Sequence, residues 1–278
     1  FPNAMGRMVN SIVIENDRKE EWTSLKDNPD YAKLSADELK EKIKAAGIVG
    51  MGGAAFPTLV KLSPPKEKPI DSVIINGAEC EPYLTADYRL MVERPQEIVE
   101  GLKILMKILG VNKGFIGIEN NKPDAIEKMK VAVKNDPNIE VCALEVKYPQ
   151  GAEKMLIKAA TGREVPPRGL PMDVKVVVQN VGTALVVYEA ARYGKPLIER
   201  VVTVTGEGIK NPANLIVKIG TLVSDIIEEC GGFKGGDGKV VSGGPMMGFA
   251  ISTLDVPVTK GTSGILVIPE EGVVHAEE

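Results

Sequence analysis

The sequence predicts an α/β protein with a mainly parallel sheet, followed by a small α+β domain. Between about residues 71 and 193, short β-branched runs alternate with segments of helical periodicity. Val174–Val178 is rich in valine, as expected of a strand that is buried on both faces. After Pro196 the alternation gives way to closely spaced strands. Strands that alternate with helices imply a parallel sheet that is covered on both sides.

The elements of the larger domain follow from local signals. Ser35-Ala-Asp-Glu38 is a capping box that starts a helix, and Gly47 is placed to end it. After Pro95, apolar residues recur at helical spacing up to Leu109, where Gly110 stops the helix. The other expected strands and helices are Asp71–Ile75, Gly114–Ile118, Glu140–Val146 and Val174–Val178, and Pro123–Lys134, Gly151–Thr161 and Gly182–Tyr193.

The smaller domain is expected to be of the β-grasp type. Its predicted order is strand, strand, helix, strand, in the segments Val201–Thr205, Asn214–Lys218, Thr221–Cys230 and Val240–Ser242. The expected boundaries are 35–196 for the α/β domain, 197–250 for the β-grasp domain and 251–278 for C-terminal strands and a tail. Phe1–Ala4 resemble an expression-vector scar, and Ser11–Ile14 fits the last strand of a preceding domain, so 1–34 is interpreted as a remnant.

Composition excludes several classes of function. The formal net charge of −4 offers no basic face for a phosphate backbone, so we expect no nucleic-acid partner. No run approaches the roughly 18 apolar residues of a membrane span, so membrane association is expected to come through a partner. Cys80, Cys142 and Cys230 lie far apart, and His275 is the only histidine. We therefore predict no metal site in this sequence and expect its chemistry to come from a cofactor.

A glycine-rich segment after the first helix is the first candidate site. Gly50, Gly52 and Ala55 satisfy a dinucleotide fingerprint, but a helix precedes them where that motif requires a strand. Gly50, Gly52 and Gly53 can bring backbone N–H groups against a phosphate or a planar ring, with Lys61 as a counter-charge. The alternative is a tight structural loop in which glycine only permits positive φ.

The segment after the first predicted strand is the second candidate. Asn76 could hydrogen-bond a heterocycle, and Glu79 and Glu81 could bind ribose hydroxyls or position a nicotinamide. Ligands of open α/β sheets collect at the carboxyl ends of the strands, where these residues are expected. The alternative is an acidic turn in solvent.

Two further loops are expected at the same edge. Tyr148, Gly151 and Glu153 lie between a strand and a helix N-terminus, where N–H groups favour anions, although Glu153 could simply stabilise the helix dipole. Asn180 and Thr183 follow the buried valine strand and could instead cap the next helix. Together, four such loops predict a nucleotide-sized site.

The four motifs, taken in order, resemble a known family. Gly-x-Gly-Gly-Ala-x-Phe-Pro-Thr from Gly50, Asn-Gly-Ala-Glu-Cys-Glu-Pro from Asn76, Tyr-Pro-x-Gly-Ala-Glu-Lys from Tyr148 and Gln-Asn-Val-Gly-Thr from Gln179 are similar to those of the RnfC subunit of the Rnf electron-transport complex. They are more distantly similar to the NADH-oxidising flavoprotein subunit of respiratory complex I. The resemblance covers about 47–193 for the flavin domain and 201–244 for a soluble-ligand-binding β-grasp (SLBB) domain.

The resemblance implies an NAD-dependent flavin oxidoreductase that transfers a hydride between NAD(H) and FMN. It implies that the FMN site contains Gly50, Gly52, Gly53, Thr58 and Lys61, with Asn180 and Thr183 at the phosphate end. Phe56 would stack on NADH, and Tyr148 and Gly151 would close the nucleotide site. Asn76 and Glu79 would line the isoalloxazine and nicotinamide side, with Glu81 and Glu153 as the catalytic carboxylates.

The resemblance also implies partners and a location. Other Rnf subunits and a ferredoxin-linked electron chain would be the partners, on the cytoplasmic side of the membrane as a peripheral protein. Two [4Fe–4S] clusters are expected only in a C-terminal part that this sequence lacks. Three positions depart from the family pattern: Ala55 stands where a glycine is expected, and Ala78 and Ala152 where the flavoprotein of complex I has acids.

Three alternative functions remain open. Two are flavoprotein paralogues, the cobalamin reductase of propanediol microcompartments and an RnfC-like protein of proline reductase systems. The third is a non-catalytic adaptor whose flavin site has decayed. Retention of Gly52, Gly53, Lys61, Asn76 and Glu81 argues against the adaptor.

Overall fold

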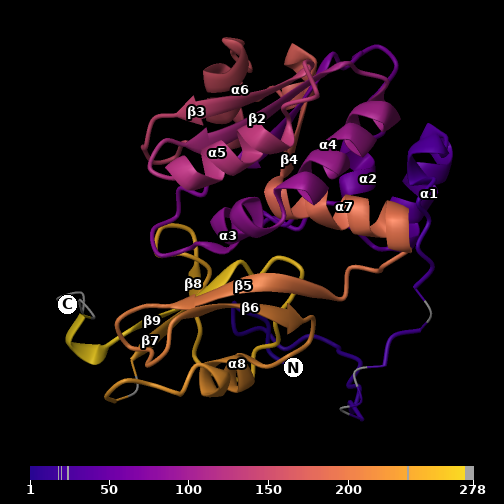
Figure 1. The fold of residues 1–278 in the computed structure, drawn as a ribbon. Helices are drawn as coiled ribbons and strands as arrows, with labels where there is room; N and C mark the ends of the chain where they lie inside the picture. The colour runs from indigo at the N-terminus through magenta and orange to yellow at the C-terminus, as the bar shows by residue number, and fades with distance from the viewer. Residues whose placement is uncertain (18, 20, 24, 237, 273–278) are drawn as a thin grey trace. The chain divides into compact units, whose positions relative to one another are not determined.

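The computed structural model describes residues 1–17, 19, 21–23, 25–236 and 238–272, so His275 and the end of the predicted tail lie outside the described residues. The chain divides into two compact units (Figure 1). The α/β unit contains 26–80 and 87–197, and the small unit contains 1–25, 81–86 and 198–278. The predicted fold class, a parallel α/β sheet followed by a small α+β domain with its own sheet, is confirmed.

A four-stranded parallel sheet forms the centre of the α/β unit. Its order is β3–β2–β1–β4, with the strands β1 (Ser72–Gly77), β2 (Lys113–Glu119), β3 (Ile139–Leu144) and β4 (Val176–Asn180). Ile75 lies beside Ile116 on one side and beside Gln179 on the other. Because all four strands run in one direction, their carboxyl ends lie at one edge of the sheet.

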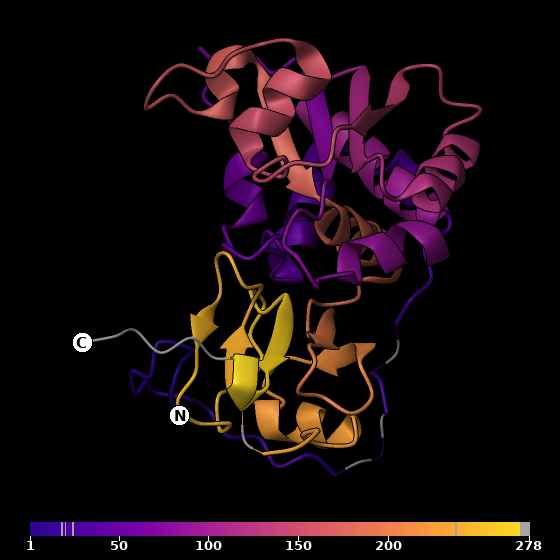
Figure 2. The ribbon, with the colours of Figure 1, turned by 90° about the vertical axis from the view of Figure 1, so that its left-hand side faces the viewer.

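Helices cover both faces of this sheet (Figure 2). One face packs against α1 (Ala36–Ala45), α4 (Pro95–Leu109), α5 (Pro123–Ala132) and α7 (Val181–Tyr193), and the other against α6 (Glu153–Thr161). Helices α4 and α7 approach closely at Gly101, where a methyl group would overlap the backbone of Ala184. Glycine at 101 therefore sets the spacing of the two largest helices.

Several elements differ from the sequence prediction. Helices α2 (Thr58–Lys61) and α3 (Ala86–Glu93) were not predicted. Strands β1 and β4 each end two residues later than expected, so Asn76 is the next-to-last residue of β1 and Asn180 is the last residue of β4. Helix α6 starts at Glu153 instead of Gly151, because 150–152 form a turn. The chain also contains the short 3-10 helices Tyr31–Lys33, Pro171–Val174 and Glu270–Gly272.

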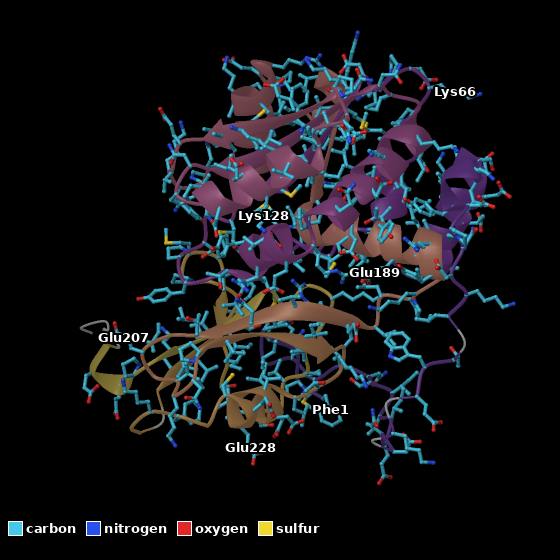
Figure 3. All side chains as sticks on the ribbon, in the orientation of Figure 1. Phe1, Lys66, Lys128, Glu189, Glu207 and Glu228 are labelled. Atoms are coloured by element: carbon cyan, nitrogen blue, oxygen red, sulfur yellow. The ribbon has the colours of Figure 1, made fainter. Side chains whose placement is uncertain are left out.

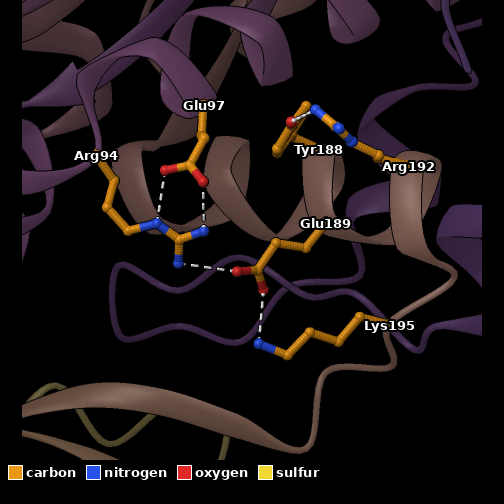
Figure 4. A network of polar contacts seen from close by, with 6 residues as sticks. All are labelled: Arg94, Glu97, Tyr188, Glu189, Arg192 and Lys195. Carbon is orange, nitrogen blue, oxygen red and sulfur yellow. Dashed lines mark hydrogen bonds and ion pairs between the residues drawn. The ribbon is translucent and has the colours of Figure 1, made fainter. Parts of the chain in front are cut away.

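A network of charged side chains holds α4 against α7 (Figure 4). The Arg94 guanidinium donates to Glu97 through two nitrogens, at 2.6 and 2.7 Å, and to Glu189 at 2.9 Å. Lys195 pairs with the other oxygen of Glu189 at 3.1 Å. The Glu189 side chain is only 9% exposed, so it is a buried acid placed between two cations.

The small unit contains a five-stranded mixed sheet of order β6–β5–β9–β7–β8. Its elements are β5 (Glu199–Thr205), β6 (Ala213–Lys218), α8 (Val223–Glu229), β7 (Lys239–Ser242), β8 (Phe249–Ala250) and β9 (Gly264–Ile268). Strand β9 pairs with β5 in parallel and with β7 antiparallel, so part of the expected C-terminal segment is the middle strand of this sheet. Ser11–Ile14, predicted as the last strand of a preceding domain, are exposed and irregular in this structure.

None of the helices in the described parts of the chain combines the length and hydrophobicity that a bilayer crossing requires.

We expect Glu189→Ala to lower the free energy of unfolding by about 1–3 kcal/mol, since a buried partner of two cations is lost. Chemical denaturation measures this change. Glu93→Ala is the matched control, because Glu93 pairs with Arg89 on the exposed surface of α3 and such pairs contribute at most about 1 kcal/mol. Equal losses for the two variants would show that the network does not stabilise the helix pair.

Candidate functional site

The candidate site lies at the carboxyl edge of the parallel sheet. Asn76, Glu119 and Asn180 stand at or near the ends of β1, β2 and β4, and the segment after β3 leads to Gly151. This edge is where open α/β sheets bind ligands. The structure thus brings together three of the four predicted loops through the strands that precede them.

The glycine segment forms a narrow loop between α1 and α2. The Gly50 N–H donates to the Phe56 carbonyl at 2.7 Å, and Val49 pairs with Pro57. Gly53 has φ +105°, and no atom lies within 4 Å of where its side chain would project. The tip of the loop therefore offers backbone to open space, and its conformation favours glycine. Ala55 has φ 50°, an unusual value for a residue with a side chain.

Thr183 fastens this loop to α7, and Asn180 lies beside the loop. The buried Thr183 hydroxyl accepts the Met51 N–H at 3.0 Å. A side chain at Gly52 would lie in ordinary contact with Asn180, with its Cβ 3.6 Å from that of Asn180. The glycine loop, Asn180 and Thr183 are therefore neighbours, although 131 residues of sequence lie between Met51 and Thr183.

Lys61 joins α2 to the first residue of α6 and to β4. Its ammonium lies 2.6 Å from the Glu153 carboxylate and donates to the Val178 carbonyl of β4 at 3.0 Å. The Lys61 and Glu153 side chains are 30% and 36% exposed. The structure thus pairs the expected phosphate counter-charge with one of the expected nicotinamide-side acids.

Asn76 joins the end of β1 to the turn before α6. Its amide donates to the Gly151 carbonyl at 2.9 Å and accepts the Ala78 N–H at 3.1 Å. The Gly151 N–H points to the sulfur of Cys80 at 3.4 Å. A side chain at Gly151 would overlap the Ala78 carbonyl, so this close approach requires glycine.

Glu79 links the β1 loop to α3. Its two carboxylate oxygens accept the N–H groups of Asp87 and Tyr88 at 2.9 and 3.1 Å, at the start of α3. The Asn180 amide donates to Asp87 at 2.6 Å and accepts the Gly182 N–H at 2.8 Å. Desolvation, together with the nearby Asp87 carboxylate, raises the pKa of Glu79 to about 7.

Glu81 belongs to the small unit. One of its carboxylate oxygens accepts the Met246 N–H at 3.1 Å, and the other is buried without a partner. Gly244 packs directly against this carboxylate. Within that unit, Glu81 is therefore held by the turn between β7 and β8.

Phe56 and Tyr148 are 46% and 43% exposed, so each ring keeps a surface that a planar ligand could contact.

Sequence reasoning missed three buried polar residues at or after the ends of the strands. Gln150, Gln179 and Glu119 are each 2% exposed, and each has one buried polar atom without a partner. The Thr58 hydroxyl, on a residue that the motif did include, is also buried and unpartnered. Gln150 and Gln179 lie inside the quoted motifs and could have been found there. Glu119 carried no such signal, because its environment depends on the packing of distant loops.

Two other possible sites were considered: a cavity in the α/β unit and a metal site among the described residues. A cavity of about 480 Å³ lies at the opposite, amino edge of the sheet, lined by Asp71, Lys113 and Glu140 among others. Parallel sheets place their ligands at the other edge, so we do not assign a function to it. Within the described residues, no group of three or more His, Cys, Asp or Glu side chains could hold a metal ion.

Comparison with known families identifies the domains of this chain. The family model for the Nuo51 FMN-binding domain matches residues 43–189, more than half of the chain. The chain belongs to the Nuo51 FMN-binding domain family. A model for the SLBB domain matches residues 201–250.

Curated relatives of this Nuo51-family chain are the C components of ion-translocating complexes. The chain is 54% identical to that component of the proton-translocating ferredoxin:NAD(+) oxidoreductase complex of Clostridium ljungdahlii, over all of this chain and 61% of the relative. It is 52% identical to that component of the Na(+)-translocating complex of Acetobacterium woodii, over 97% of this chain and 61% of the relative. The chain therefore spans about three fifths of their length, and the predicted similarity to RnfC is confirmed.

A solved structure shares the fold of this family member. An NAD+-reducing [NiFe]-hydrogenase in the H2-reduced state aligns with 87% of this chain and 48% of its own, with a TM-score of 0.73 and 20% identity.

The raised pKa of Glu79 predicts a pH dependence of stability. The folded state keeps this proton to higher pH than the unfolded chain, so the free energy of unfolding should fall as pH rises from about 4.5 to about 7. The fall attributable to Glu79 should reach about 2–3 kcal/mol. Denaturant unfolding of Glu79→Gln across this range should show a flatter dependence. Glu164→Gln, at an exposed site, should leave the fall in place; a parental slope in Glu79→Gln would contradict the assignment.

Proposed function

We propose that this chain binds FMN and NADH and transfers a hydride between them, as the electron-input part of an ion-translocating ferredoxin:NAD oxidoreductase. The observation that carries the proposal is the meeting of the open glycine loop, Lys61 and the Asn76–Gly151 pair at one sheet edge. Membership of the Nuo51 FMN-binding domain family supports it.

The residues present fit FMN. The tip of the loop at Gly53 leaves space for a ring beside exposed backbone. The Lys61 ammonium is only partly buried and can approach an anion, and the Thr58 hydroxyl and Gln179 amide carry hydrogen-bonding atoms without a partner. An oxygen-rich phosphate and ribityl chain matches such groups. Gly50, Gly52, Gly53, Thr58 and Lys61 would hold the flavin, with Asn180 and Thr183 shaping its pocket.

The acidic residues fit the nicotinamide side. Carboxylates repel a phosphate but accept hydrogen bonds from ribose hydroxyls and a carboxamide, the role we assign to Glu153. Phe56 and Tyr148 offer exposed ring surface for stacking. Asn76, Glu79 and Gly151 fix the backbone of this side. Bound FMN would supply the redox chemistry by accepting the hydride, and the protein would orient it.

The wider role is inferred from the relatives. We propose that electrons pass on to iron–sulfur clusters and to other Rnf subunits, at the cytoplasmic face of the membrane. A cobalamin-reductase or proline-reductase paralogue would share the flavin chemistry, and an adaptor would not. Absorbance spectra of the purified chain with FMN and then NADH separate a flavoenzyme from an adaptor: flavin bleaching supports flavin chemistry in this chain, and absence of binding favours the adaptor.

Lys61→Met should weaken FMN binding by about 1–3 kcal/mol, the range for a charge-assisted hydrogen bond. Riboflavin, which lacks the phosphate, should lose less. Fluorescence quenching measures both affinities. Lys66→Met, in the loop after α2, is a control for the change in net charge. Equal losses for FMN and riboflavin would place Lys61 away from the phosphate.

Glu153→Gln should bind FMN at least as tightly as the parent, because it frees the Lys61 ammonium from its carboxylate. The same variant should be reduced more slowly by NADH in stopped-flow absorbance, since a neutral amide oxygen is a weaker acceptor for the carboxamide than the carboxylate. NADPH should be a poor donor to the parental chain, because its additional phosphate would meet an acidic surface. A parental rate in Glu153→Gln would remove this glutamate from the nucleotide site.

Gly52→Val should abolish FMN binding with little loss of stability. Gly52 does not have a positive φ, and a Cβ there makes only ordinary contacts, so the added isopropyl group should obstruct the ligand more than the fold. Gly236→Val, at an open position of the small unit, is the control. Parental flavin quenching by Gly52→Val would show that the glycine loop is structural.

A further inference from the structure

A buried ion pair at the end of β2 has no part in the function proposed above. Lys122 precedes α5, and its ammonium lies 3.1 Å from the carboxylate of Glu119, the last residue of β2. The Lys122 and Glu119 side chains are only 12% and 2% exposed. Lysine and glutamate are rarely buried to this extent.

The Lys122 ammonium also has a second acceptor. The Lys122 ammonium also donates to the main-chain carbonyl of Glu79 at 3.3 Å. That carbonyl belongs to the loop that follows β1, Ala78–Cys80. Lys122 therefore ties the end of β2 to this loop through its backbone, whichever side chains the loop carries.

Further hydrogen bonds connect this loop to other strands at the same edge of the sheet. The Glu79 carboxylate receives the first N–H groups of α3, and Asp87 of α3 receives the Asn180 amide at the end of β4. In the opposite direction along the loop, Asn76 reaches the Gly151 carbonyl. One lysine thus anchors a continuous set of hydrogen bonds that joins β2, β1 and β4.

Stability alone does not explain such a pair. Replacing a buried ion pair by apolar groups is often neutral or stabilising, because desolvation offsets the Coulomb attraction. Buried pairs are better explained where they select one arrangement of the chain. Here the arrangement selected is that of a loop with few apolar contacts to fix it: of Ala78–Cys80, only Ala78 is buried.

We propose that Lys122 is a positioning residue of the candidate nucleotide site, one that fixes the Ala78–Cys80 loop to the end of β2. This inference rests on the proposed function, in which that loop lines the flavin and nicotinamide side. Lys122 itself touches neither ligand; it acts through the backbone of Glu79.

The variants are chosen to separate the tether from the buried charge. Lys122→Met alone leaves Glu119 buried without its cation, so the main variant combines Lys122→Met with Glu119→Gln. Lys122→Arg keeps the positive charge and the hydrogen-bond donors, so it should behave as the parent does. The double variant loses one charge of each sign, so its net charge is that of the parent. Lys128→Met, on the exposed surface of α5 and labelled in Figure 3, shows the effect of removing a lysine that has no buried partner.

The first measurement is amide hydrogen exchange of the unliganded chain. In the double variant, exchange of the Ala78–Cys80 amides and of the Asp87 and Tyr88 amides should speed up by about tenfold or more, while the strands of the sheet stay protected. Lys122→Arg and Lys128→Met should exchange as the parent does. Unchanged exchange in the loop, or faster exchange throughout the α/β unit, would overturn the proposal.

The second measurement is flavin reduction. The double variant should lower the rate at saturating NADH by about tenfold or more through loss of orientation, while the FMN dissociation constant changes by less than about threefold. A parental rate in a variant with a loosened loop would overturn the role of Lys122 in this site. If the parental chain itself is not reduced by NADH, the proposed function fails, and hydrogen exchange still decides whether Lys122 holds the loop.

Discussion

The parallel pairing of β1 with both β2 and β4 is the constraint on which the candidate site depends. It aligns the ends of three strands whose sequences are separated by a helix or more, and it places Asn76 beside Asn180 in register. Parallel strands require crossover connections, so each strand end is followed by a loop that returns over the sheet. The candidate site consists of those loops. Its polar groups lie close together only because the strands end at one edge of the sheet.

The parts of this arrangement that sequence reasoning found have local causes. Apolar runs mark the strands, the Ser35 capping box marks α1, and Gly110 adopts the left-handed conformation that ends α4. The motif residues Asn76 and Asn180 could be predicted as neighbours because they follow such runs. The Asn180 side chain caps α7 and also donates to Asp87, so the capping role and a place at the candidate site are compatible.

The parts that were missed have distant causes. Helix α3 is short, and its first N–H groups are capped by Glu79, which lies eight and nine residues earlier in sequence. No local pattern signals that cap. Glu119 and Lys122 look like solvent-exposed residues of a turn until the β1 loop is placed over them. In the small unit, Thr85 donates through its backbone to Thr203 and bonds Asn214, contacts that assign 81–86 to that unit in spite of its sequence position.

Two lysines at this edge illustrate how burial decides what a charge can do. Lys61 and Lys122 each hold a glutamate and a main-chain carbonyl, so the two contacts are alike in kind. Lys61 and Glu153 keep about a third of their side-chain surface, and solvent or a ligand can replace either partner at small cost. Lys122 and Glu119 are almost fully buried, so separating them would leave a charge without solvation. The exposed pair can therefore exchange partners when an anion binds, whereas the buried pair can only stay in place. This difference supports the proposed ligand-binding role of Lys61 and the proposed positioning role of Lys122.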